Sequence, residues 1–175
     1  LYRGDPERLV RVPWWAQAGP SVTRREAGRF FTQGDGWSPV TGCTEAGRVF
    51  TDVHCGDQDW PFIQAFYEHG ITGGCGSGNF CADFTITRGQ MMVFLLKVEH
   101  GAGFDPGPCV GNIFTDVTCA GQFDAWIEEA SQEGLTGGCG GTLFCPNNPI
   151  TEWQTAVFVN KPVIAPNYRS IPGGS

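Results

Sequence analysis

The sequence predicts a mainly helical fold made of tandem 64-residue helix-loop-helix repeats whose loops are closed by disulfides. Three observations predict it: two motifs that recur at one spacing, a helix-start signature that recurs at the same spacing, and cysteines that follow the repeat. The chain of 175 residues is long enough for one domain of ordinary size with its own hydrophobic core.

Two motifs recur at a distance of 64 residues and reveal the repeat. Phe-Thr-Asp-Val at 50–53 returns at 114–117, and Gly-Ile-Thr-Gly-Gly-Cys at 70–75 returns as Gly-Leu-Thr-Gly-Gly-Cys at 134–139. Self-similarity at a fixed period is the signature of repeat architectures, in which each unit buries its apolar face against its neighbours. The chain therefore holds two full repeats, preceded by half of another.

A helix-start signature occurs three times at the same spacing. Thr23, Thr87 and Thr151 are each followed three residues later by Glu or Gln. In this pairing the two side chains satisfy free backbone N–H groups at the start of a helix. Apolar residues at helical spacing follow each threonine. We expect three equivalent rings to meet in one core: Phe30, Phe94 and Phe158.

Each full repeat has a second helix before its Gly-rich turn. Gly70 and Gly134 supply the left-handed stop of this helix. The segments that follow, 72–85 and 136–149, are too rich in Gly, Asn and Cys for a helix or a long strand, so we expect loops held by disulfides. Apolar residues of the second helix have matching positions in the two copies: Phe62, Ile63 and Phe66, then Trp126, Ile127 and Ala130.

The repeat divides the chain into five parts. The first residues have neither an initiator Met nor the apolar core of a signal peptide, so we expect a processed or partial product. The parts are an N-terminal arm (1–21), a half repeat with its linker (22–42), the first repeat (43–106), the second repeat (107–160) and a Pro-rich C-terminal arm (161–175).

Eight cysteines follow the repeat, with no Cys-x-x-Cys pair. This usage in a short chain is typical of disulfides formed in an oxidising compartment, which indicates an extracellular or cell-surface protein. Pairing within each unit preserves the repeat and needs no chain crossing, and each short loop would contribute roughly 2 to 3 kcal/mol. The predicted pairs are Cys43 with Cys55, Cys75 with Cys81, Cys109 with Cys119, and Cys139 with Cys145.

Metal sites are the alternative use of these cysteines. Zinc sites usually draw on close Cys-x-x-Cys or His pairs, whereas the cysteines here are more widely spaced and no histidine is in register. Asp57 and Asp59 suggest calcium, but their surroundings lack the rest of a twelve-residue calcium loop. We therefore expect no metal and no cofactor.

Charge and composition exclude several classes of function. The chain has 11 Lys and Arg against 18 Asp and Glu, and no basic cluster longer than residues 23–25, so we expect no nucleic-acid partner. No apolar run is long enough to predict a membrane span. His54, His69 and His100 occupy unrelated repeat positions, and no nucleophile elbow, phosphate loop or carboxylate pair occurs, so we expect no enzyme.

The motifs together resemble the S-layer homology repeat. The resemblance rests on Phe-Thr-Asp-Val, on an aromatic-rich helix ending in Gly-Ile-Thr-Gly-Gly-Cys-Gly, and on Ile-Thr-Arg-Gly-Gln leading into Met-Met-Val-Phe-Leu-Leu. It covers about residues 22–160, and the Cys pair around the loop resembles secreted bacterial members. It implies an extracytoplasmic, mainly helical protein whose three repeats pack as a pseudo-threefold bundle, and it implies binding to a cell-wall polysaccharide.

The resemblance also implies site residues. In the family the Arg of the Thr-Arg motif lines a glycan groove, which here implies Arg24 and Arg88. A guanidinium fork can hold an acid group of a glycan through two hydrogen bonds. The third copy has Glu152, which inverts the local charge. The alternative is that both arginines are exposed residues of the first helical turn, where a cation is mildly unfavourable.

Other residues are candidates for glycan contact. Asp52 and Asp116 are expected as turn or capping residues, with glycan contact as the alternative. Trp60 could stack on a sugar face, whereas Trp126 falls in the apolar stripe of its helix and is expected in the core.

The two arms contain more apolar residues than a solvated tail needs: Trp14, Trp15, Val163, Ile164 and Tyr168. Such arms can dock on a neighbouring copy, and a head-to-tail contact that does not close gives a filament. The alternative for both arms is a floppy terminus. The sequence therefore favours a non-enzymatic extracellular structural protein that assembles with copies of itself into a surface layer, fibre or tube. The alternative function is a module that anchors to cell-wall polysaccharide.

Overall fold

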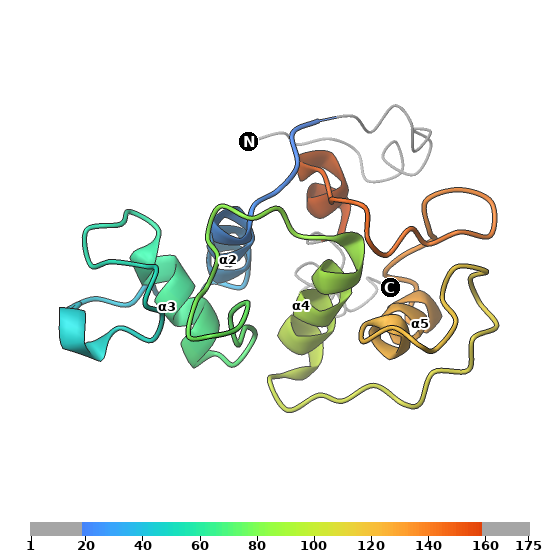
Figure 1. Ribbon diagram of the computed structural model, residues 1–175, viewed down its shortest axis with the longest axis horizontal. Coiled ribbons are helices and arrows are strands. Elements are labelled where there is room, and N and C mark those ends of the chain that lie inside the picture. Colours follow the sequence, from blue (N-terminus) through green and yellow to red (C-terminus); the bar gives the residue numbers. More distant parts are fainter. Residues whose placement is uncertain (1–18, 159–175) are drawn as a thin grey trace, which may run out of the picture.

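The computed structural model describes residues 19–158, which are mainly helical (Figure 1). The predicted assembly residues Trp14, Trp15, Val163, Ile164 and Tyr168 lie outside the described residues. Extended pairing within residues 19–158 is limited to isolated bridges. The elements in chain order are α2 (Arg24–Gly34), the 3-10 helix η2 (Glu45–Gly47), α3 (Trp60–Glu68), α4 (Arg88–His100) and α5 (Asp124–Gln132), and the chain is helical again over 152–158.

The predicted helix starts are confirmed. Thr23 and Thr87 are the N-caps of α2 and α4, and each makes both hydrogen bonds of a capping box with the residue three positions later. Thr151 and Gln154 exchange the same two bonds, each of 3.3 Å, before the helical residues 152–158. The sequence locates these starts because the capping pair is a local interaction that needs no tertiary context.

The helices pack in pairs, α2 against α3 and α4 against α5, and α4 lies between the two pairs in Figure 1. Aromatic rings join the pairs. The ring centroid of Phe94 in α4 lies 5.0 Å from that of Phe66 in α3 and 6.3 Å from that of Phe31 in α2. Both contacts are edge-to-face, a favourable arrangement for aromatic rings. One hydrophobic core therefore extends across α2, α3 and α4.

Three segments that precede helices meet in a closed ring of backbone hydrogen bonds. The N–H of Val22 donates to Ile150 O (2.9 Å), the N–H of Ile86 to Val22 O (2.9 Å), and the N–H of Ile150 to Ile86 O (3.0 Å). All three side chains are fully buried. The ring fixes the starts of α2, α4 and the helical residues 152–158 to one another.

The prediction that Phe30, Phe94 and Phe158 meet in one core is wrong for Phe30. Phe94 and Phe158 are buried, but Phe30 is only half-buried and packs against the edge of the core. Phe31 takes the central position instead, because the buried face of α2 runs through Ala27 and Phe31, four residues apart. In contrast, α4 is buried on most of its surface, so its ring at the equivalent position lies inside.

The four disulfides join the cysteines that the sequence predicts to pair: Cys43–Cys55, Cys75–Cys81, Cys109–Cys119 and Cys139–Cys145. Every cysteine is paired, so no thiolate is left to hold zinc. Gly70 and Gly134 follow α3 and α5 with φ of 71° and 74°, the left-handed conformation predicted for them.

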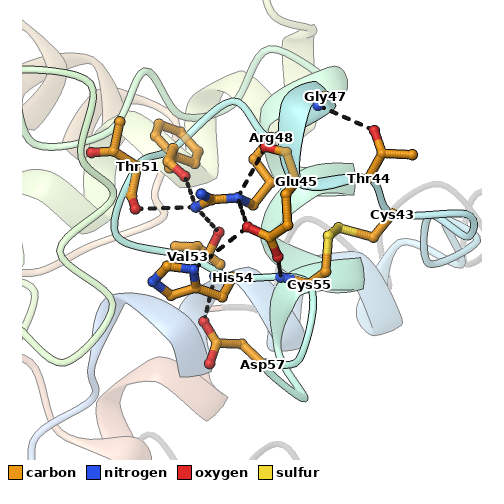
Figure 2. The surroundings of a disulfide bond; sticks show 11 residues. Cys43, Thr44, Glu45, Gly47, Arg48, Thr51, Val53, His54, Cys55 and Asp57 are labelled. Carbon is orange, nitrogen blue, oxygen red and sulfur yellow. Dashed lines mark hydrogen bonds and ion pairs between the residues drawn. A yellow bond between two sulfur atoms is a disulfide. The ribbon is translucent and has the colours of Figure 1, made fainter.

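The two equivalent disulfide loops before α3 and α5 are stabilised by different side chains. In the loop 43–55, Arg48 points into a nest of carbonyl oxygens and donates from Nη1 to Phe50 O, Thr51 O and Val53 O at 3.0–3.2 Å (Figure 2). Glu45 pairs with Arg48 at 2.6 Å and accepts the N–H of Cys55, a hydrogen bond that lowers the pKa of the Glu45 carboxyl.

In the loop 109–119 a buried carboxylate performs this role. Glu128 of α5 accepts the N–H groups of Val110 (2.6 Å), Gly111 (2.7 Å) and Asn112 (3.2 Å). A carboxylate that accepts several backbone N–H groups forms strong hydrogen bonds without a cation beside it. The residue one repeat earlier is Gln64, which instead donates to Glu68.

Truncation of a residue of the ring should destabilise the protein strongly. Ile86→Ala removes buried methyl groups where three helix starts meet, and we expect the free energy of unfolding to fall by about 2 to 5 kcal/mol. Urea unfolding with the disulfides intact measures the change. Val110→Ala is the control, because Val110 is 68% exposed and should change stability by less than about 0.5 kcal/mol. Similar losses in the two variants would contradict the central role of the ring.

Candidate functional site

The first loop between helices is clamped at Phe80 by two of the predicted glycan-binding residues. Nε of Arg24 donates to Phe80 O at 2.6 Å, and Nη2 donates to Thr72 Oγ1 at 3.2 Å. The carboxylate of Asp52 accepts the N–H groups of Phe80 and Cys81, both at 2.7 Å. Arg24 and Asp52 therefore hold the two sides of one buried residue.

The same clamp occurs one repeat later at Phe144. Nε of Arg88 donates to Phe144 O at 2.9 Å, and Nη2 donates to Gly138 O at 3.0 Å. Asp116 accepts the N–H groups of Phe144 (2.8 Å) and Cys145 (2.7 Å). The four predicted site residues Arg24, Asp52, Arg88 and Asp116 thus form two matching clamps rather than one common cluster.

Both arginines are inside the protein, which corrects the alternative that they are exposed residues of a first helical turn. Arg24 is 6% exposed and Arg88 3% exposed. The Arg24 guanidinium lies 4.9 Å from the centre of the Phe80 ring, and that of Arg88 lies 4.8 Å from the Phe144 ring, so cation–π contacts compensate part of the lost hydration. Burial lowers the pKa of Arg24, and it lowers the pKa of Arg88 to about 10.

The position of Glu152 breaks the series. Its backbone N–H donates to Pro20 O at 3.1 Å, as the N–H of Arg24 donates to Phe84 O and that of Arg88 to Asn148 O. The backbone of the third copy is therefore placed like the other two, but the Glu152 side chain is exposed and does not form a buried clamp.

Trp60 and the acidic pair near it are not available to a sugar or a metal ion. Trp60 is 6% exposed and belongs to the hydrophobic core, so its faces are covered. Asp59 forms ion pairs with Arg25 and Arg29, and these cations occupy the carboxylate. Trp126, expected in the core, is half-buried and packs against it.

A groove of about 420 Å³ opens beside Arg24. Its walls come from the Gly-rich loop after α3, from the first turns of α4 and from the residues that precede α5. The lining residues are Arg24, Ile71, Thr72, Gly73, Gly74, Cys75, Phe84, Thr85, Gln90, Val93, Phe94, Lys97, Gln122 and Phe123.

The groove is positively charged on an acidic protein. The whole chain has a formal net charge of -7, yet Arg24 and Lys97 line the groove and no Asp or Glu does. Lys97 Nζ donates to Gly70 O at 3.4 Å, which uses one of its three protons. Amides of Gln90 and Gln122 add neutral hydrogen-bonding groups. The groove can therefore bind a ligand that has an anionic group and hydroxyls.

Sequence reasoning missed Lys97, Phe84 and Glu128. Lys97 is one repeat before Lys161, a match at 64 residues that could have marked it. Phe84 and Glu128 had no such signal, because the residues one repeat away from them are Asn148 and Gln64.

The family model described as the S-layer homology domain matches residues 49–92. This chain contains an S-layer homology domain. The matched segment includes Asp52, α3, the clamped loop with its disulfide Cys75–Cys81, and the start of α4. The comparison with curated proteins found no match.

The family gives the chain a general role. S-layer homology domains are structural and anchoring modules of the cell surface that bind cell-wall polysaccharides. The disulfides fit an extracellular protein. Within residues 19–158, no helix has the length and apolar character needed to cross a membrane.

Removal of one clamp carboxylate should loosen its loop. Asp116→Ala leaves the N–H groups of Phe144 and Cys145 without their acceptor, and we expect a loss of about 1.5 to 3 kcal/mol in the free energy of unfolding. Urea unfolding gives the total, and hydrogen exchange at the Phe144 amide locates it. The exposed Asp105 provides the control variant Asp105→Ala. Unchanged exchange at Phe144 would contradict the clamp.

Proposed function

We propose that this chain anchors to a cell-wall polysaccharide through the groove beside Arg24. The observation that carries the proposal is the pair of cations, Arg24 and Lys97, in a groove without a carboxylate on a protein of net charge -7. The matched S-layer homology domain supplies one wall of this groove, the residues from Ile71 to Phe84.

The geometry suits an acidic saccharide. A carboxylate or similar acid group would lie near Lys97, whose ammonium can donate two further hydrogen bonds, and near the guanidinium of Arg24. Because Arg24 already donates to Phe80 O and Thr72 Oγ1, it cannot swing out to meet a ligand. Its charge is therefore preorganised, which lowers the entropy cost of binding.

The pseudo-threefold packing of the repeats is part of this proposal. It keeps the predicted parts, with 22–42 as a half repeat, 43–106 and 107–160 as repeats, and 1–21 and 161–175 as arms. Two observations support it: the hydrogen-bond ring of Val22, Ile86 and Ile150 is cyclic, and the helices begin at Arg24, Arg88 and residue 152, 64 residues apart.

Loss of the groove lysine should weaken binding to cell walls. Lys97→Gln removes a positive charge from the groove while leaving the buried clamp of Arg24 intact, and we expect about tenfold weaker binding. Sedimentation with purified cell-wall sacculi that retain their secondary polysaccharide measures it, and the same sacculi after hydrofluoric acid extraction provide the background. Lys97→Arg keeps the charge and is the matched control.

Two results would contradict the anchoring proposal. One is equal sedimentation of wild type with intact and extracted sacculi. The other is equal binding of Lys97→Gln and Lys97→Arg. Arg24→Ala is a poor test, because it would also release the loop at Phe80 and leave a buried carbonyl oxygen without its donor.

Self-assembly is a second candidate function. It is favoured by the apolar residues of the two arms, Trp14 and Trp15 in one and Val163, Ile164 and Tyr168 in the other. Anchoring and assembly are compatible, since a subunit held on the wall can also contact its neighbours. The partner in this case is a second copy of the chain.

Deletion of residues 161–175 tests the assembly role. We expect it to abolish polymers seen by negative-stain electron microscopy and light scattering, while far-UV circular dichroism shows that the helices remain. Polymers that are unchanged after the deletion would refute a role of this arm. A wild-type particle that stays monodisperse near 18.9 kDa would refute self-assembly itself.

A further inference from the structure

Phe84 combines an exposed ring with a fixed backbone. The residue is 68% exposed, although it lines the groove beside Arg24. Its carbonyl oxygen accepts the N–H of Arg24 at 2.9 Å, and its own N–H donates to Cys81 O at 3.0 Å. The disulfide Cys75–Cys81 closes the same loop. The ring is therefore held at the groove wall in solvent.

Exposure alone does not distinguish Phe84, because single exposed apolar residues are normal on protein surfaces. Val110 is also 68% exposed, and Leu143 is 44% exposed, but neither lines the groove. Phe84 differs in its neighbours, since the same groove contains the cations Arg24 and Lys97 and the amide of Gln90. A flat apolar face beside hydrogen-bonding groups matches a pyranose ring, which has an apolar C–H face and polar hydroxyl edges.

We propose that Phe84 is a stacking platform for one sugar ring of an acidic saccharide. The acid group binds at Lys97 and Arg24, and the C–H face of a pyranose packs on the Phe84 ring. This inference rests on the proposed anchoring function and adds to it a contact residue and a requirement on the ligand. The ligand needs an anionic group within about one sugar ring of an unsubstituted C–H face.

The platform also makes the binding positions of the repeats unequal. The backbone N–H groups of Arg24, Arg88 and residue 152 donate to equivalent carbonyls, those of Phe84, Asn148 and Pro20. These bonds place Phe84, Asn148 and Pro20 at matching points of the fold. An Asn side chain has no flat apolar face, so the position beside Arg88 should bind the saccharide more weakly. We therefore expect one tight site per chain.

Isothermal titration calorimetry with cell-wall polysaccharide released from purified sacculi by mild acid tests the platform. Phe84→Ala should weaken binding about tenfold and leave the urea midpoint unchanged, because the ring is mostly outside the core. Phe84→Trp keeps a stacking face and should bind within about threefold of wild type. Val110→Ala removes an equally exposed apolar side chain outside the groove and should bind like wild type.

The outcomes separate the two proposals. Wild type and Phe84→Ala that bind equally, with Lys97→Gln still weak, would overturn the stacking platform and leave the anchoring function in place. Equal loss in Phe84→Ala and Phe84→Trp would also overturn it, because a stacking role requires rescue by another aromatic ring. Wild type that does not bind the polysaccharide would refute the anchoring function and the platform with it.

Discussion

The hydrogen-bond ring of Val22, Ile86 and Ile150 is the constraint on which the arrangement depends. Each residue donates one bond and accepts another, so displacing any one of the three segments breaks two bonds in a fully buried place. A buried backbone group without a partner is costly, and this cost keeps the ring closed. Because each ring residue stands just before a Thr N-cap, the ring fixes three helix starts. Arg24 and Arg88, the first residues of α2 and α4, are thereby directed into the interior.

The interior position changes what these arginines do. A buried guanidinium loses hydration, and this loss lowers the pKa of both groups. Hydrogen bonds to Phe80 O and Phe144 O, the aromatic faces of the same residues, and the nearby carboxylates of Asp52 and Asp116 compensate. The charge that faces the groove is therefore also a clamp on the loop that forms its wall. Folding of the loop and shaping of the groove depend on the same side chain.

What the sequence predicts correctly is local or periodic. Capping pairs, glycine stops and disulfides within one repeat involve residues close in the chain, and a 64-residue period makes them visible twice or three times. The burial of Trp60 and the half-exposure of Phe30 were beyond it, because both depend on which helix lies in the middle of the packing. The groove was equally hidden, since α4, α5 and the loop after α3 meet only in three dimensions.

The two repeats agree in backbone and differ in side chains, and this difference bears on function. Backbone bonds such as those of Arg24 to Phe84 and Arg88 to Asn148 recur, so the fold does not require a ring at Phe84. The loops before α3 and α5 likewise reach similar disulfides through Arg48 in one case and Glu128 in the other. An exposed Phe that the packing does not need, in a groove whose only charges are positive, is best explained by a ligand, because in water alone the ring gains nothing from its position.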